Sequence, residues 1–294
     1  MRFGVIPPVR VGVCADPAWM LGFARHAEAC GFECLVAVEH TVVVSEYASR
    51  YPYATSGRMP LPDDCAIPDP LDLLAFLAAG TDRIGLSTGV LILPNHHPVV
   101  LAKRIATVDV LSGGRLRMCL GVGWMEEELR TVGVDPATRG RRADEQIEVM
   151  RTLWADSGPG GASFDGEFFS FRGVHSFPKP SRSTGVPLHI GGHSPAAARR
   201  AGRRGDGFQP LGLDDTLLAE RLDEMRQAAE QAGRDPSALE VTVSGYLPTT
   251  GPEDIEALAA QGVDRLVMST SMSDDLARVK DEMSAFMDRV ADLG

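Results

Sequence analysis

Lysine is scarce in this 294-residue chain, which contains only Lys103, Lys179 and Lys280, and acidic residues outnumber basic ones by 40 to 29. The net charge of −11 argues against a nucleic-acid partner, because such proteins need a basic surface. No apolar run approaches the roughly 18 residues of a membrane span. The N-terminus passes directly into residues 3–6 without the cleavage site of a signal peptide. We therefore expect a cytoplasmic protein with no nucleic-acid partner and no membrane association.

Cysteine and the common catalytic motifs are also sparse. The five cysteines form no pair with the two-residue gap of zinc or redox motifs, so we expect Cys30 and Cys34 to behave as small buried hydrophobes. The sequence contains no nucleophile elbow, Walker loop or zinc-protease helix. His96 and His97 are adjacent, but their side chains should diverge and no carboxylate pattern accompanies them. We expect no metal site.

Short apolar segments alternate with stretches of helical period, a pattern typical of parallel βα units. Eight strands are predicted, at residues 2–6, 34–39, 83–91, 115–121, 187–191, 206–211, 240–245 and 264–268. This count predicts an α/β fold, a (β/α)₈ TIM barrel formed by residues 1–294 as a single domain.

Proline and glycine mark the predicted helix ends. Five helices are expected to begin with proline, whose missing N–H would have no partner there, at residues 17, 70, 98, 195 and 252. Helices are expected to end at glycine, at residues 31, 80, 202, 233 and 262.

Two segments interrupt the alternation, after strands two and four. Residues 41–68 contain three of the four tyrosines, and residues 156–186 contain an aromatic run with a hairpin predicted at Asp165-Gly166. Loops of this length are usually functional lids or linkers, and these are too aromatic for linkers. We interpret both as insertions in the barrel.

In an α/β barrel the loops that follow the strands build the active site. Gly191, Gly192, His193 and Ser194 precede a predicted helix whose N-terminus would suit a phosphate, although a plain capped turn explains them equally well. The run from Gly121 to Gly123 lacks the third glycine of a dinucleotide fingerprint.

Charged residues follow the second and fourth predicted strands. His40, preceded by Glu39, stands at the end of the second strand, where an acid–base or cofactor-contacting role is slightly favoured over a structural one. Residues Glu126 to Glu128 open a helix, and two of these three carboxylates are expected to be solvated.

Together these segments resemble the luciferase-like monooxygenase superfamily, in particular its branch that uses the deazaflavin coenzyme F420. The matching residues are Val38-Glu39-His40, 86–91, 111–115, 121–124 with Glu128, 190–195 and 205–207. The resemblance implies cofactor contacts from Gly89, Val90, Gly121, Gly123, Trp124, Gly191, Gly192, His193 and Ser194, and catalytic roles for His40 and Glu39.

The resemblance also implies a cis peptide between Gly89 and Val90, a homodimer, and hydride transfer between C5 of F420 and a small organic substrate. Val44 stands where the branch that oxidises glucose 6-phosphate has tryptophan, and lysines for a substrate phosphate are nearly absent, so a sugar phosphate is not expected. One alternative is an FMN-dependent monooxygenase of the same superfamily. Another, of a different class, is a non-catalytic flavin-binding protein.

Overall fold

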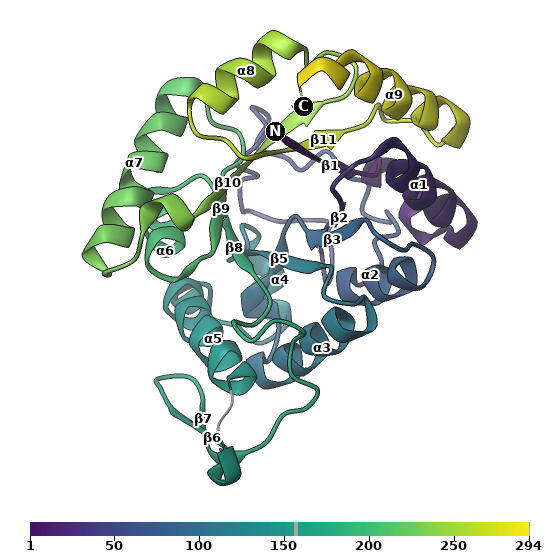
Figure 1. Cartoon of the computed structure of the whole chain (residues 1–294). Coiled ribbons are helices and arrows are strands. Elements are labelled where there is room, and N and C mark those ends of the chain that lie inside the picture. The colour runs from purple at the N-terminus through teal and green to yellow at the C-terminus, as the bar shows by residue number, and fades with distance from the viewer. Residues whose placement is uncertain (156–157, 294) are drawn as a thin grey trace.

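The computed structural model describes residues 1–155 and 158–293. Eight parallel strands close into a barrel, in the order β1-β2-β3-β5-β8-β9-β10-β11 and back to β1 (Figure 1). They are β1 (Arg2–Ile6), β2 (Cys34–Ala37), β3 (Gly85–Thr88), β5 (Leu116–Gly121), β8 (Leu188–Gly191), β9 (Gly207–Gln209), β10 (Glu240–Tyr246) and β11 (Arg265–Ser269). The predicted (β/α)₈ barrel is confirmed.

The third strand is interrupted and continues as β4 (Leu91–Ile92). Leu86 pairs with Leu116 of β5, and Leu91 pairs with Leu120 of β5. The interval from residue 86 to residue 91 is therefore one residue longer than the interval on β5 with which it pairs. The extra residue falls between Thr88 and Leu91 and makes a bulge at the C-terminal end of the barrel.

Helices form the outer ring around the strands (Figure 1). They are α1 (Pro17–Cys30), α2 (Pro70–Ala79), α3 (Pro98–Leu111), α4 (Glu126–Thr131), α5 (Arg139–Trp154), α6 (Pro195–Arg204), α7 (Asp215–Gln231), α8 (Pro252–Ala260) and α9 (Leu276–Arg289). Short 3₁₀ helices occur at Val9–Val11, Val13–Ala15, Leu93–Asn95, Pro136–Thr138, Gly158–Gly160, Pro236–Ala238 and Ala291–Leu293.

All five predicted proline starts are confirmed, and Asp16, Asp69 and Ser194 cap three of these helices with their side chains. The predicted helix end at Gly202 is wrong, because α6 continues to Arg204. A β-carbon on Gly202 would lie 2.2 Å from the carbonyl oxygen of Met225 on α7. Glycine is therefore there for close packing of two helices.

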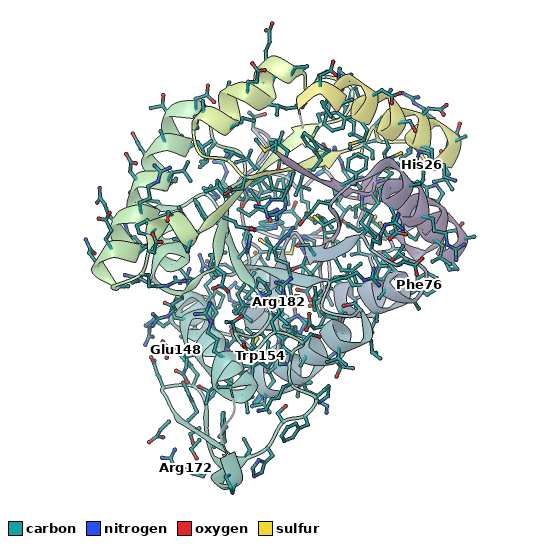
Figure 2. All side chains as sticks on the ribbon, in the orientation of Figure 1. His26, Phe76, Glu148, Trp154, Arg172 and Arg182 are labelled. Carbon is teal, nitrogen blue, oxygen red and sulfur yellow. The ribbon has the colours of Figure 1, made fainter. Side chains whose placement is uncertain are left out.

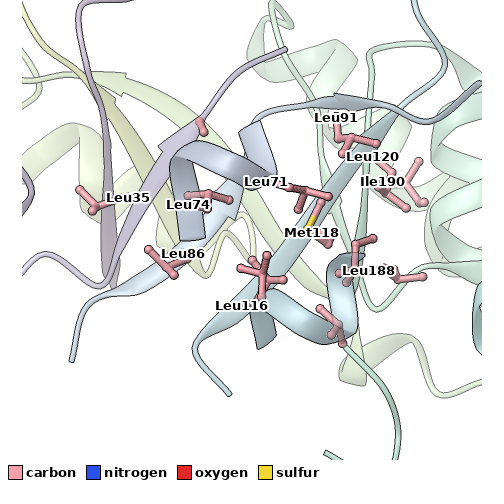
Figure 3. Packing of buried hydrophobic residues seen from close by; sticks show 14 of the residues in the cluster. Leu35, Leu71, Leu74, Leu86, Leu91, Leu116, Met118, Leu120, Leu188 and Ile190 are labelled. Atoms are coloured by element: carbon pink, nitrogen blue, oxygen red, sulfur yellow. The ribbon is translucent and has the colours of Figure 1, made fainter. Parts of the chain in front are cut away.

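The core fills the barrel and the layer between strands and helices. Leucine, isoleucine and methionine side chains of β3, β5 and β8 pack with leucines of α2, as Figure 3 shows for Leu74, Leu86, Met118 and Leu188, all fully buried. Buried parallel strands need such continuous apolar surfaces because helices cover them. No helix in residues 1–155 or 158–293 is both long and apolar enough to cross a bilayer.

The two insertions differ in structure. Residues 41–68 contain neither helix nor strand. Within the second insertion, β6 (Ala162–Asp165) pairs with β7 (Ser170–Val174), which confirms the predicted hairpin, and the hairpin projects from the barrel (Figure 1). The expected start of this insertion, residues 156 and 157, lies outside the described residues.

Candidate active site

The floor of the candidate site is the bulge after β3, where the peptide bond between Gly89 and Val90 is cis, as predicted. A β-carbon built on Gly121 would lie 2.6 Å from a methyl group of Val90, and one on Gly191 would lie 2.4 Å from the other. Glycine is required at both positions to admit the Val90 side chain. The structure thus gives these two glycines a packing role at the centre of the barrel end.

His40 and Glu128 form the buried polar pair of this site. His40 Nδ1 lies 2.9 Å from Oε2 of Glu128, and the two side chains are only 12% and 2% exposed. The other carboxylate oxygen accepts a bond from the Thr41 amide at 2.7 Å and one from Asn95 Nδ2 at 3.3 Å. Because a carboxylate only accepts, we assign the proton to Nδ1. His40 Nε2 has no protein partner in the described part of the chain and is available for proton transfer.

Glu39 is buried beside this pair but faces other partners. Its Oε1 lies 2.6 Å from His96 Nε2, and its Oε2 accepts a hydrogen bond from the Ile92 amide. Both oxygens are thereby committed to the segment that follows the bulge. The neighbouring His97 turns to the ring of Phe169, so the two adjacent histidines diverge as expected.

The first insertion, residues 41–68, lies over this end of the barrel and is called the lid here. Glu127 at the start of α4 accepts hydrogen bonds from the Ala48 amide at 2.8 Å and from the Ser49 hydroxyl at 2.7 Å. Burial alone raises the pKa of this carboxyl, but the Ser49 hydroxyl and nearby amides outweigh burial and lower it to about 2. Only Glu128 is buried, while Glu126 and Glu127 are partly exposed, so the expectation that two of the three glutamates are solvated is confirmed, although Glu127 also binds the lid.

Two tyrosines of the lid belong to a row of aromatic rings in edge-to-face contact. Trp124 lies between His40, at a centroid distance of 6.3 Å, and Tyr51, at 5.1 Å. Tyr51 contacts Tyr53, and Tyr53 contacts His193, each at 5.3 Å. Burial, with smaller effects from Tyr51 and Cys119, raises the pKa of Tyr53 to about 12. This row of rings therefore runs from the His40–Glu128 pair to the start of α6.

The turn between β8 and α6 has a distinct set of free donors. The Gly192 amide donates to the Gln209 carbonyl at 3.3 Å, and Ser194 Oγ accepts from the Ala197 amide at 3.2 Å. Among the described residues no acceptor takes the amides of His193, Ser194 and Ala196. These amides, at the positive end of the α6 dipole, can bind an anion. Gly192 adopts φ +128°, a conformation that favours glycine, so its contribution is conformational.

A cavity of about 420 Å³ adjoins the site between the lid and α4. It is lined by Trp124 and by polar or charged residues of both segments, among them Ser49, Arg50, Glu126 and Arg130. Trp124 thus lines this cavity and also contacts Tyr47 and Tyr51 of the lid.

Sequence reasoning located His40, the bulge and the β8–α6 turn, and the structure brings them to one end of the barrel. It missed the role of Glu128, which lies within a run of three glutamates on the short helix α4. The spacing of this run gave no sign that its third member is buried. Asn95, which also binds Glu128, was visible only as a polar residue after the third strand.

The fold and the site define a (β/α)₈-barrel protein with a buried histidine–glutamate pair and a turn of unpaired amides among its described residues, both at the C-terminal end of its strands. The chain belongs to the luciferase-like monooxygenase family, whose sequence profile matches residues 1–288. An uncharacterised protein of Mycobacterium tuberculosis is 38% identical over 170 residues, 57% of this chain and 58% of that protein. A second one from the same organism is 31% identical over 219 residues, 74% of each chain. The chain thus spans a little over half the length of the first relative.

Solved structures share the fold at low sequence identity. The monooxygenase RslO1 of Streptomyces bottropensis matches with a TM-score of 0.79 at 21% identity, covering 100% of this chain and 99% of that one. An F420-dependent secondary alcohol dehydrogenase, in complex with an F420–acetone adduct, matches with a TM-score of 0.80 at 18% identity and the same coverage. A type II Baeyer–Villiger monooxygenase from Pseudomonas putida, in complex with FMN, matches with a TM-score of 0.65 at 22% identity, covering 84% of this chain and 67% of that one.

Proposed function

We propose that this protein is an oxidoreductase that uses coenzyme F420 and transfers a hydride between the deazaflavin C5 and a small organic substrate. The observation that carries the proposal is the buried His40–Glu128 pair at the same end of the barrel as the free amides of α6. Oxidation of an alcohol or reduction of a carbonyl needs a group that handles a proton beside the carbon that exchanges hydride. The similarity to the F420-dependent secondary alcohol dehydrogenase supports this choice.

The residues of the β8–α6 turn fit the anionic part of such a cofactor. The amides of His193, Ser194 and Ala196 would hold a phosphate, while Gly192 shapes the turn and Ser194 Oγ caps the helix. Val90 would support the ring system from below, together with Gly89, and Gly121 and Gly123 give that floor its shape. When bound, the deazaflavin supplies the hydride donor or acceptor at C5.

His40 would move the proton. With Nδ1–H directed to the buried Glu128 carboxylate, Nε2 is the nitrogen that can accept a proton from a substrate hydroxyl or return it to a carbonyl. Glu128 orients the ring through this hydrogen bond. Glu39 is a positioning residue in this proposal, because His96 and the Ile92 amide occupy both of its oxygens.

The lid would exclude water and form part of the substrate pocket. Tyr53 contacts His193 with its hydroxyl 3.4 Å from Nδ1, directly at the turn proposed to bind the phosphate. We therefore expect Tyr53 to move when the cofactor enters. The aromatic side chains of Trp124, Tyr47 and Tyr51 favour a substrate with an apolar part.

The test is a titration of the purified protein with oxidised F420 and separately with FMN, followed by anaerobic turnover with a panel of secondary alcohols. We expect F420 to bind more tightly and its visible absorbance to fall only when an alcohol is present. His40→Ala should retain F420 binding and lose turnover by a factor of roughly 10² to 10⁴.

Two other outcomes identify the rivals. Oxygen uptake and substrate oxygenation with reduced FMN would instead support an FMN-dependent monooxygenase, a possibility that the FMN-bound Pseudomonas putida structure keeps relevant. Tight flavin or deazaflavin binding without turnover across the panel would support a non-catalytic binding protein.

A further inference from the structure

A second cavity lies at the opposite end of the barrel from the candidate active site. Its volume is about 520 Å³, within the range of small-molecule sites. Arg2, Leu116 and Arg265 line it and are the first residues of β1, β5 and β11, so it opens at the N-terminal ends of the parallel strands. Six arginines contribute to its wall: Arg2, Arg83, Arg115, Arg117, Arg182 and Arg265.

The wall carries a positive charge in an acidic protein. The only carboxylates among its lining residues are Glu33, Asp206 and Glu240, so six arginines and three acids give a formal charge of +3, against −11 for the whole chain. His189 adds no charge near neutral pH, because burial and the adjacent Arg117 lower its pKa to about 3 against the opposing effect of Glu240.

The inner layer of the cavity is internally paired. Arg265, only 1% exposed, donates to both oxygens of Glu33, at 2.9 and 3.1 Å, and to Glu240 at 3.0 Å. Arg117 donates to Glu33 at 3.0 Å and Arg2 donates to Glu240 at 2.6 Å. Two carboxylates are thus shared by three guanidinium groups, and neither has an oxygen left without an arginine.

The outer layer is less tightly paired. Within the part of the chain that the structure describes, Arg83, Arg115 and Arg182 form no salt bridge within 4 Å. Burial raises the pKa of the Glu28 carboxyl, but the amides of residues 82–84 and then the charge of Arg83 lower it, so Arg83 has Glu28 as an acidic neighbour. Arg115 donates to backbone carbonyls and Thr81, and Arg182 donates to the Gly114 carbonyl at 3.4 Å. Arg182, labelled near the middle of the view in Figure 2, lines the cavity together with Arg117. Asp206, the third acid, is held in a two-oxygen ion pair by Arg151, outside the cavity.

We propose that this cavity binds the phosphate group of a small anion, as free phosphate or a phosphomonoester. A dianion would offset most of the surplus charge, and guanidinium groups bind phosphate oxygens through paired, charge-assisted hydrogen bonds. Arg83 and Arg182 are exposed and carry no ion pair that binding would have to break. The site lies apart from the β8–α6 turn, so the two anion sites are independent of each other and of the proposed redox function.

The experiment is isothermal titration of the full chain with inorganic phosphate and with ribose 5-phosphate, with ribose as the uncharged control. The variant Arg83→Gln/Arg182→Gln removes the two exposed guanidinium groups without touching the paired inner layer. We expect at least a tenfold weaker binding of the preferred probe to this variant. The matched control is Arg199→Gln/Arg203→Gln, which removes two exposed arginines of α6 outside the cavity and should bind as the wild type does.

The same titration of Gly192→Val separates this site from the β8–α6 turn, because that variant should keep the probe affinity. Tighter binding of free phosphate than of ribose 5-phosphate would identify the inorganic ion as the ligand, and the reverse would identify a phosphomonoester. The proposal is overturned if neither probe binds the wild type, if Arg83→Gln/Arg182→Gln binds like the wild type, or if the affinity is lost in Gly192→Val instead.

Discussion

His40 and Glu128 are 88 positions apart in the chain, yet His40 Nδ1 lies 2.9 Å from a carboxylate oxygen of Glu128 with both side chains buried. The pair joins the loop after β2 to helix α4 across the end of the barrel. It gives the candidate site a histidine with a fixed ring orientation and one free nitrogen.

Replacement of Glu128 by glutamine should lower turnover on the order of 10²-fold, because the amide keeps the size of the side chain but lacks the carboxylate that accepts from His40 Nδ1 and fixes the ring. Steady-state kinetics at several pH values, with cofactor titration alongside, measure this. Cofactor affinity should stay close to that of the wild type. Glu126→Gln is the matched control, since Glu126 pairs with Arg130 at the surface. Equal losses in both variants would show that α4 as a whole is affected and that Glu128 has no special role.

Gly192→Val should weaken cofactor binding by about one to two powers of ten, the effect of losing one good charge-assisted hydrogen bond. The reason is conformational: valine at φ +128° shifts the turn that presents the amides of His193, Ser194 and Ala196. Gly233→Val, at φ +69° between α7 and Pro236, carries a comparable backbone strain far from the site. Both variants should lose roughly 1–3 kcal/mol of stability by thermal melting. Unchanged cofactor affinity in Gly192→Val would place the phosphate elsewhere.

Tyr53→Ala should speed cofactor association, because the ring that covers His193 would no longer have to move first. Stopped-flow mixing of the protein with cofactor measures the rate. Tyr246→Ala, which removes a 41% exposed tyrosine at the end of β10, should associate as the wild type does. Slower association in Tyr53→Ala would indicate that Tyr53 contacts the cofactor itself.

His189 should make the protein less stable as the pH falls below neutrality. Burial, then Arg117, lowers its pKa from 6.5 to about 3 in the folded state, with Glu240 opposing. Below pH 6.5 His189 is therefore protonated in the unfolded chain but stays neutral in the folded protein. The free energy of unfolding that is present above pH 6.5 is consequently lost as the pH falls from 6.5 towards 3. Thermal melting between pH 7 and 5 should show a smaller decline for His189→Gln than for the wild type. The matched variant is His26→Gln, which replaces a part-buried histidine of α1 that contacts Lys280 and Ser284 of α9, and it is melted over the same pH range.

The homodimer implied by the family resemblance stays a prediction. Light scattering after size exclusion should give twice the 31.5 kDa of one chain. Val100 and Leu111 on α3 are 58% and 71% exposed, and such apolar surface suits contact with a second copy. Val100→Glu/Leu111→Glu should then produce a monomer. A wild-type mass of 31.5 kDa would contradict the prediction.

The sequence alone determined the barrel, because its signals are local. Apolar segments of strand length, proline at five helix starts and glycine after helices each act within a few residues, and the structure confirms the order of strands they predict. The fate of Gly202 shows the limit of such signals. A glycine near the end of a helical segment predicts that the helix ends there. The actual role of Gly202 is close packing against the Met225 carbonyl of another helix, which no local pattern indicates.

The tertiary structure decided everything that joins distant segments. It selected Glu128 from three consecutive glutamates as the partner of His40, set Gly121 and Gly191 around Val90, and gathered six arginines from separate strands and loops at the N-terminal mouth. No local pattern encodes these contacts, because the residues meet only when the barrel closes. The physical reason is that parallel strands bring their equivalent ends together in space, however far apart those ends lie along the chain.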